Sequence, residues 1–205
     1  MNGIIIKRKR ETNKWGGIIV KKAWIIVLAV IVLLGFSAMG SYNGLVGLNE
    51  SVNGKWSQVD VQLQRRADLI PNLVSTVQGF AAQEKDILKS IADARSKLVG
   101  AQGVANKAAA NEELSSTLSR LLVVVENYPN LKSDANFRQL QDELAGTENR
   151  IAVSRKDYND SVQIFNAKIK TFPNAIFAGM LGFTPREYFQ ADAAAKVVPK
   201  VEFKQ

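Results

Sequence analysis

The sequence contains no cysteine and no histidine among its 205 residues. The first absence excludes disulfides, cysteine nucleophiles and a lipoprotein anchor, and the two together exclude zinc clusters of the usual kind. Without histidine there is neither a Ser-His-Asp triad nor imidazole acid–base chemistry. The Glu-x-x-His signature of di-metal helical bundles is missing as well, so we predict no metal, no cofactor and no catalytic residues. A glycosidase needs only two carboxylates, but no acidic spacing indicates one.

Proline and aromatic residues are scarce, with five prolines and 8% aromatics. Hydrophobic residues make up 46% of the chain and charged residues 22%, which is typical of a folded protein. No stretch alternates apolar and polar residues as a strand does. The composition therefore favours an all-α fold.

The net charge of +8 is concentrated at one end of the chain. Residues 1–22 hold seven basic residues against one acid, which gives +6 and leaves +2 for all the rest. A nucleic-acid reader carries its basic surface on the folded domain. We therefore predict no nucleic-acid partner and assign the basic segment to the flank of a membrane anchor.

The segment after this basic tail, residues 23–40, reads AWIIVLAVIVLLGFSAMG and carries no charge. As a helix it spans ~27 Å, close to the ~30 Å hydrocarbon core of a bilayer. Trp24 and Tyr42 stand at its two ends, where aromatic residues mark the interfaces. The alternative is a signal peptide cleaved after Ala38 to Gly40, but the apolar run exceeds the usual h-region of about 7–15 residues.

Four parts follow from these patterns. They are a basic cytoplasmic tail (1–22), a transmembrane helix (23–41), a helical-bundle domain (42–190) and a C-terminal tail (191–205). The positive-inside rule places the N-terminus in the cytoplasm and the bundle outside it. We expect a single-pass membrane protein, with membrane lipid as its first partner.

Apolar residues at steps of three and four predict the helices of the bundle. One stripe occupies 42–66 and is expected to continue directly from the span. A break or kink is expected at 68–71, where Pro71 lies. A heptad-like stripe then runs from Leu73 through Glu84 to Leu98, ended by Gly100 and Gly103. A third helix covers 104–128, a fourth runs from an N-cap at Ser133 to Lys170, and a short apolar helix lies within 174–192. Short connections between such helices predict an antiparallel up-down bundle.

Several polar residues interrupt these apolar stripes. Glu84 occupies a seam position, and a buried carboxylate is costly unless it is paired. We hypothesise that Glu84 meets Arg66 or Arg155 in a buried polar layer. Such a layer either fixes helix register or forms a ligand or partner site. The candidate polar-layer or interaction residues are Arg65, Arg66, Asp68, Asn72, Glu84, Glu126, Glu148, Arg155 and Asn159.

The same residues resemble the bacterial LemA family. The resemblance rests on YNGLV at 42–46, WSQVDVQLQRRADLIPNLV at 56–74, ENYPNL at 126–131, FRQLQ at 137–141, ENRIA at 148–152, RKDYN at 155–159 and the pair Phe172 and Pro173. These motifs keep the family's order and cover about 42–190. The resemblance implies a membrane-tethered antiparallel bundle without established catalysis. A magnetosome-associated relative linked with membrane invagination extends the implication to envelope organisation.

Two functions remain open at this point. The first is a non-enzymatic scaffold that forms a homo-oligomer and organises or shapes the envelope. The second is an extracytoplasmic module that binds or senses a protein or small-molecule partner, through the polar layer or through the tail around Phe177 to Phe189.

Overall fold

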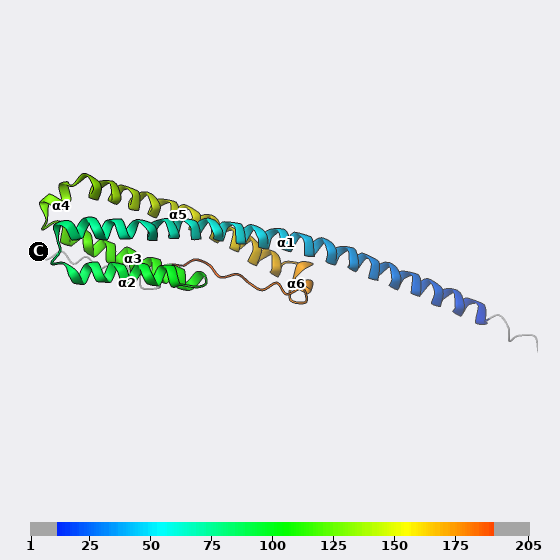
Figure 1. The fold of residues 1–205 in the computed structure, drawn as a ribbon. Helices are drawn as coiled ribbons and strands as arrows, with labels where there is room; N and C mark the ends of the chain where they lie inside the picture. The colour runs from blue at the N-terminus through cyan, green and yellow to red at the C-terminus, as the bar shows by residue number, and fades with distance from the viewer. Residues whose placement is uncertain (1–11, 191–205) are drawn as a thin grey trace, which may run out of the picture. The chain divides into compact units, whose positions relative to one another are not determined.

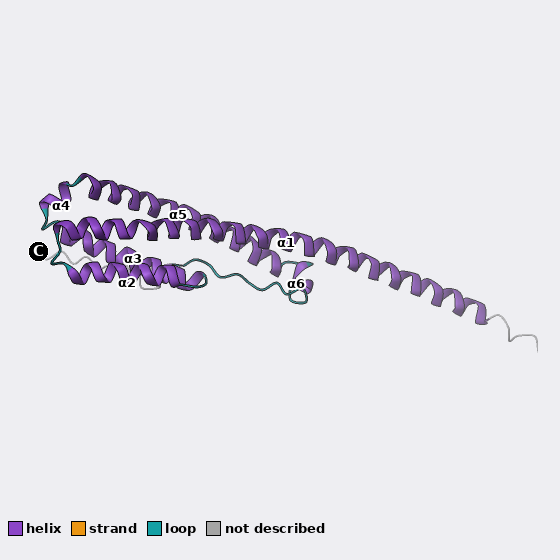
Figure 2. Cartoon of the chain, in the orientation of Figure 1, coloured by secondary structure: helices purple, strands orange, loops and turns teal. Residues whose placement is uncertain are grey.

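The computed structural model describes residues 12–190, and it is helical with no strand in that range (Figures 1 and 2). The chain divides into two compact units. The anchor unit comprises the chain up to Val46 and Lys168–Thr184, and the bundle unit comprises Gly47–Ala167 and the segment from Pro185. The helices are α1 (Thr12–Phe80), α2 (Lys85–Gly100), α3 (Val104–Val125), α4 (Pro129–Ser133), α5 (Ala135–Lys170) and α6 (Asn174–Phe177). The first part of the predicted basic tail and the whole C-terminal tail, 191–205, lie outside the described residues.

Helix α1 contains a stretch long and apolar enough to cross a membrane. Its side chains from Trp24 to Phe36 are exposed in the protein, as expected of a surface that contacts lipid. The prediction of an apolar N-terminal helix is therefore confirmed. The helix continues without interruption to Phe80, so one element supplies both the span and the first helix of the bundle.

A break or kink was predicted at 68–71, and the helix is not broken there, because Pro71 lies inside α1. Proline has no N–H, so the carbonyl of Ala67, four residues earlier, loses its helical donor. The Arg95 side chain on α2 replaces that donor, with Nε–H donating to the Ala67 oxygen at 2.9 Å. The chain instead reverses at residues 81–84, which also ends the predicted continuous stripe from Leu73 to Leu98.

The bundle unit alternates in direction from helix to helix, as Figure 1 shows. Cross-helix ion pairs fix this order. Lys97 on α2 pairs with Glu113 on α3 across the turn at 101–103. Lys107 on α3 pairs with Asp60 on α1, and Lys55 on α1 pairs with Asp157 on α5 at 3.0 Å. The predicted antiparallel up-down bundle is confirmed.

The core of the bundle unit is formed by the predicted apolar stripes. Each fully buried Leu, Ile or Phe side chain contributes about 1.5–3 kcal/mol relative to exposure. The largest fully buried side chains of this unit are Val52, Leu63, Ile70, Leu73, Ile91, Leu114, Leu121, Leu131, Phe137, Ile151 and Phe165. Because all four long helices contribute, the bundle has one shared core.

Two helix boundaries differ from the sequence prediction for identifiable reasons. The N-cap of α5 is Asp134 and not Ser133, since an Asp134 carboxylate oxygen accepts the N–H of Phe137 at 2.9 Å. The helix predicted within 174–192 is reduced to α6, and residues 183–190 have no helical structure.

Candidate functional site

A buried arginine joins three helices of the bundle unit. Arg66 on α1 is 4% exposed. Its Nη1 donates to the Asn111 side-chain oxygen at 2.8 Å and to the Ser115 hydroxyl at 3.0 Å, both on α3. The same nitrogen lies 2.6 Å from a Glu148 carboxylate oxygen on α5. Arg66 therefore occupies the polar layer that the sequence predicted, but with Glu148 as its acidic partner.

Two opposing effects act on the pKa of Arg66 in this cluster. Burial lowers the pKa of Arg66, while the Glu148 and Glu112 carboxylates raise it. A guanidinium remains protonated in proteins, so the cluster contains a permanent buried cation. The Arg66 Nε is buried and has no hydrogen-bond partner among the described residues. A buried donor left unpaired costs about 1–3 kcal/mol, and such an atom is a candidate contact for a ligand or partner.

A pocket of about 420 Å³ opens beside Arg66 between α1, α3 and α5. A volume of that size is sufficient for a small molecule. Its wall is mostly apolar and consists of Leu73, Leu118, Leu121, Leu122, Phe137, Leu144 and Ala145, with Ser115, Ser119, Gln141, Asp142 and Glu148 as polar members. The arrangement is a buried cation, paired with Glu148, at the edge of an apolar groove.

The predicted pairing of Glu84 with an arginine is wrong. Glu84 lies at the turn before α2, where its carboxylate accepts the Tyr128 hydroxyl at 2.7 Å. The sequence placed Glu84 in an unbroken heptad seam, whereas the reversal at 81–84 removes it from the helix interior. The bond to Tyr128 instead ties this turn to the residues that follow α3.

The remaining candidates lie outside the Arg66 cluster. Arg65, Asp68 and Asn72 are exposed on α1, and Asp68 accepts a hydrogen bond from Gln64 at 2.8 Å. Glu126 pairs with Lys132 at 2.5 Å. The structure thus brings only Arg66 and Glu148 together from the candidate set as an ion pair, and a binding role for any of these residues stays a prediction.

Arg155 and Asn159 belong to a second cluster, which holds residues 185–190 against the bundle. Asn159 donates to the Phe189 carbonyl at 3.0 Å and accepts the Phe189 N–H at 2.9 Å. Asn166 makes the same pair of bonds to the backbone of Arg186, both at 2.8 Å. The Arg155 guanidinium lies 6.0 Å from the centre of the Phe189 ring. Residues 185–190 therefore form a strap, and asparagine side chains of α5 hold the strap by its main-chain N–H and carbonyl groups.

The sequence reasoning missed the other members of this strap site. Arg186 donates to the side-chain oxygens of Asn49 at 2.9 Å and Asn53 at 2.7 Å on α1. Trp56 contacts Tyr158 and Phe189, with ring centres 5.3 and 6.3 Å apart. A signal was present, since Asn159 and Asn166 are seven residues apart and so share one face of α5.

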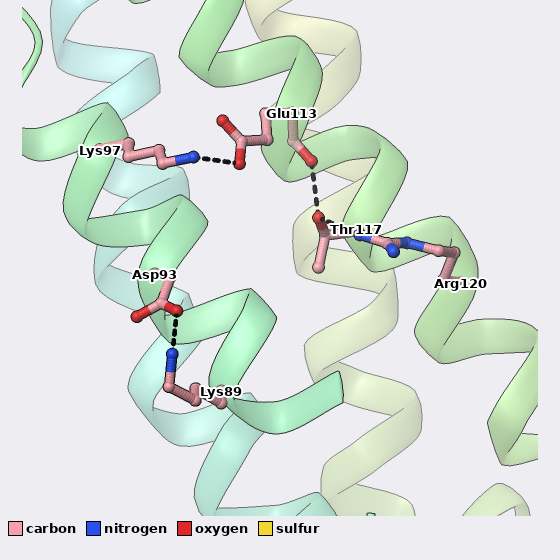
Figure 3. A network of polar contacts seen from close by, with 6 residues as sticks. All are labelled: Lys89, Asp93, Lys97, Glu113, Thr117 and Arg120. Atoms are coloured by element: carbon pink, nitrogen blue, oxygen red, sulfur yellow. Dashed lines mark hydrogen bonds and ion pairs between the residues drawn. The ribbon is translucent and has the colours of Figure 1, made fainter. Parts of the chain in front are cut away.

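A third polar cluster lies on the surface between α2 and α3 (Figure 3). Lys97 pairs with Glu113 at 2.6 Å, and Lys89 pairs with Asp93 at 2.8 Å. Thr117 donates to the Glu113 carbonyl, and Arg120 donates to the Thr117 hydroxyl at 3.1 Å. Exposed ion pairs contribute about 0–1 kcal/mol each. Of these contacts only the Lys97–Glu113 pair joins the two helices, so the cluster contributes little to stability.

The fold defines a class of protein: an all-α bundle whose first helix also contains a stretch long and apolar enough to cross a membrane. The LemA family profile matches residues 55–203, and the chain belongs to the LemA family. The family resemblance predicted from the sequence is confirmed.

Curated relatives agree with this membership. Magnetosome protein MamQ 2 of Paramagnetospirillum magneticum is 29% identical, and the alignment covers 83% of this chain and 73% of that protein. Magnetosome protein MamQ of Magnetospirillum gryphiswaldense is 28% identical, with 82% and 72% covered. Protein LemA of Metamycoplasma hominis is 25% identical, with 83% and 80% covered. None of these names is that of an enzyme.

Proposed function

We propose that this protein is a non-enzymatic, membrane-anchored scaffold that self-associates and organises or shapes the bacterial envelope. The observation that carries the proposal is the continuity of α1, which is a single helix from Thr12 to Phe80. No loop separates the span from the bundle's first helix. Copies of the bundle are therefore held at one membrane, where their effective concentration is high and modest contact surfaces are sufficient for assembly.

An apolar surface on α3 supplies a candidate contact for self-association. Val123 is 72% exposed, and its neighbour Leu122 is exposed and also lines the pocket beside Arg66. Exposed apolar side chains continuous with an apolar groove are typical of protein–protein contacts. A two-fold contact between α3 surfaces would bring the two copies of Val123 near the symmetry axis.

Disulfide cross-linking in membranes tests this contact. The chain has no cysteine, so Val123→Cys introduces a unique thiol. Under mild oxidation we expect a covalent dimer of the Val123→Cys protein. The matched control is Val61→Cys, on an equally apolar and exposed residue of α1, which we expect to remain monomeric. Equal cross-linking of both variants, or of neither, would refute an α3 contact.

The proposed orientation places the N-terminus in the cytoplasm and the bundle outside it, in the inner membrane. It is supported by the seven basic residues that precede the span. A cysteine at exposed Val153 should react with a membrane-impermeant maleimide in spheroplasts without lysis. If labelling requires lysis, the bundle lies in the cytoplasm and the proposed orientation is wrong.

The second candidate function is that of a binding or sensing module, and the pocket beside Arg66 favours it. An apolar groove with a buried cation and an unpaired Nε is complementary to an amphipathic ligand with an acceptor group. Ala145→Phe would fill the groove from its exposed rim, and Ala152→Phe, seven residues along α5, is the matched control. A co-purifying small molecule that native mass spectrometry finds in the wild type and in Ala152→Phe, but not in Ala145→Phe, would establish this function. Its absence from all three would remove this candidate.

A further inference from the structure

The turn between α5 and residues 185–190 has an inverted distribution of polar and apolar side chains. Asn174 and Ala178 are buried, each 4% exposed. Four large apolar side chains point outward instead, and these are Phe172 at 82%, Ile176 at 56%, Met180 at 84% and Leu181 at 38% exposed. Water disfavours this arrangement, because exposed apolar area carries a free-energy cost. An apolar environment would remove this cost.

The outward side chains are held by a hydrogen-bonded turn. The Ala178 N–H donates to the Asn174 carbonyl at 2.7 Å, and the Phe183 N–H donates to the Ala178 carbonyl at 2.9 Å. Gly182, with φ of 79°, permits the reversal that closes the turn. The Asn174 side chain donates to the Lys168 carbonyl at the end of α5 at 3.2 Å. These hydrogen bonds define the conformation of the turn, so its outward apolar side chains keep their positions.

Within the anchor unit this turn lies beside the end of the membrane span. The rings of Tyr42 and Phe183 are 6.1 Å apart. Tyr42 follows Gly40, the last residue of the apolar run, by two residues, or ~3 Å of helix rise. A tyrosine there sits at the headgroup boundary. Met180 and Leu181 are within three residues of Phe183, and so within ~10 Å of it.

The charge of the segment agrees with a lipid surface. Residues 168–184 contain no acidic residue. Lys168 and Lys170 are exposed in the last turn of α5. Lysines at this depth can reach lipid phosphates while their stems lie along apolar surface. Basic residues beside an apolar tip are the pattern of segments that insert into a membrane interface.

We propose that the turn at 172–181 inserts its apolar side chains into the interfacial region of the same bilayer that α1 crosses, so that the protein contacts the membrane at two points. The lipid contact surface consists of Phe172, Ile176, Met180 and Leu181. The inference depends on the anchor unit alone and goes beyond the proposed scaffold. It holds whether or not the protein self-associates.

Depth-dependent quenching on the full-length protein tests the proposal. Met180→Cys is labelled with an environment-sensitive fluorophore, and the protein is reconstituted in vesicles with or without lipids that carry a nitroxide near the headgroup. Val153→Cys, a similarly exposed apolar residue on α5 of the bundle unit, gives the reference. Phe36→Cys, within the span, shows that quenching works. Vesicles hold at most one labelled chain each, so contact with a second copy cannot mimic lipid.

We expect the Met180 label to be quenched at least twofold more than the Val153 label, with a blue-shifted emission. Quenching at Met180 no greater than at Val153, with Phe36 strongly quenched, would overturn the proposal. A blue shift at Met180 that appears only when several copies share a vesicle would also overturn it, because the occupant would then be a second copy. A second label at Ile176→Cys repeats the test, and it must give the same result.

Discussion

At the scale of single residues, the molecule is distinguished by a cation placed among apolar helices. The sequence identified both Arg66 and Glu148 as polar interruptions, because they occur at or beside apolar positions of a heptad-like stripe. It could not identify their pairing, since partner choice depends on where the chain reverses. The reversal at 81–84 follows no proline, and it moves Glu84 away and leaves Glu148 opposite Arg66.

The Arg66–Glu148 pair is expected to be energetically coupled. Glu148→Ala leaves a buried cation without its counter-ion and should lower the free energy of unfolding by about 1–3 kcal/mol, moderated because Glu148 is half-exposed. Arg66→Met also destabilises, since Asn111 and Ser115 lose their donor. The loss of unfolding free energy in the double variant should be smaller, by at least ~1 kcal/mol, than the sum of the losses in the two single variants. Urea unfolding of the detergent-solubilised protein measures this, and additive costs would show that the pair is not coupled.

Tyr158 links stability to alkaline pH. Burial raises the pKa of its phenol, Arg186 opposes that rise and Glu187 adds to it. A pKa raised above the unfolded value of about 10 contributes stability below that pH, and this contribution is lost as pH rises through the folded pKa. The unfolding free energy should therefore fall above about pH 10, and fall less in Tyr158→Phe. Identical pH profiles for the two proteins would contradict this account.

At the scale of elements, α1 is a helix in which a tertiary contact overrides a local sequence rule. Apolar periodicity predicted the helical segments and the glycine boundary after α2, because both are local properties. A break or kink at Pro71 was predicted by an equally sound local rule. The helix is unbroken there, and Arg95, distant in sequence, supplies the hydrogen bond that the proline removes. A side chain on another helix cannot be read from the periodicity of α1.

This compensation makes a testable prediction for α1. In the wild-type background, Arg95→Met should lower the free energy of unfolding by about 1–2 kcal/mol, because the Ala67 carbonyl loses its donor. In a Pro71→Ala background the restored N–H at position 71 can bond that carbonyl, so the same substitution should cost about half as much or less. Thermal unfolding of the four proteins measures the difference. An equal cost in both backgrounds would exclude the compensating role of Arg95.

The strap at 185–190 is a second element whose position depends on tertiary contacts. The apolar helix predicted around Ile176 to Leu181 does not reach it, and the clamps at Asn159 and Asn166 hold its backbone in a non-helical conformation. These clamps bond the main chain, so the strap's own side chains carry little information about them. Only the seven-residue spacing of the asparagines indicated a shared face.

Loss of a clamp should release the strap locally. Asn166→Leu removes two hydrogen bonds to Arg186, worth about 1 kcal/mol each. Trypsin cleavage after Arg186 should then accelerate by about tenfold or more, since proteolysis follows local opening. Gln163→Leu, at an exposed position of α5, is the control and should cleave at the wild-type rate. No acceleration in Asn166→Leu would mean that the clamps do not restrain the strap.

At the scale of the whole molecule, one helix carries both an apolar stretch long enough to cross a membrane and the first helix of the bundle. Composition, charge distribution and family resemblance were sufficient to predict the all-α class, the anchor and the LemA family, because these are properties of many residues together. The candidate sites were predicted only in part. The sites depend on which helices face each other. A change in the position of one turn therefore changes which side chains are paired.

The central claim is that the protein self-associates at the membrane. The most direct test is the mass of the full-length protein extracted with its surrounding lipid, measured by light scattering with the lipid contribution subtracted. We predict protein masses at multiples of the 22.5 kDa chain, with the larger species favoured at higher protein density. A strictly monomeric protein at every density would contradict the scaffold.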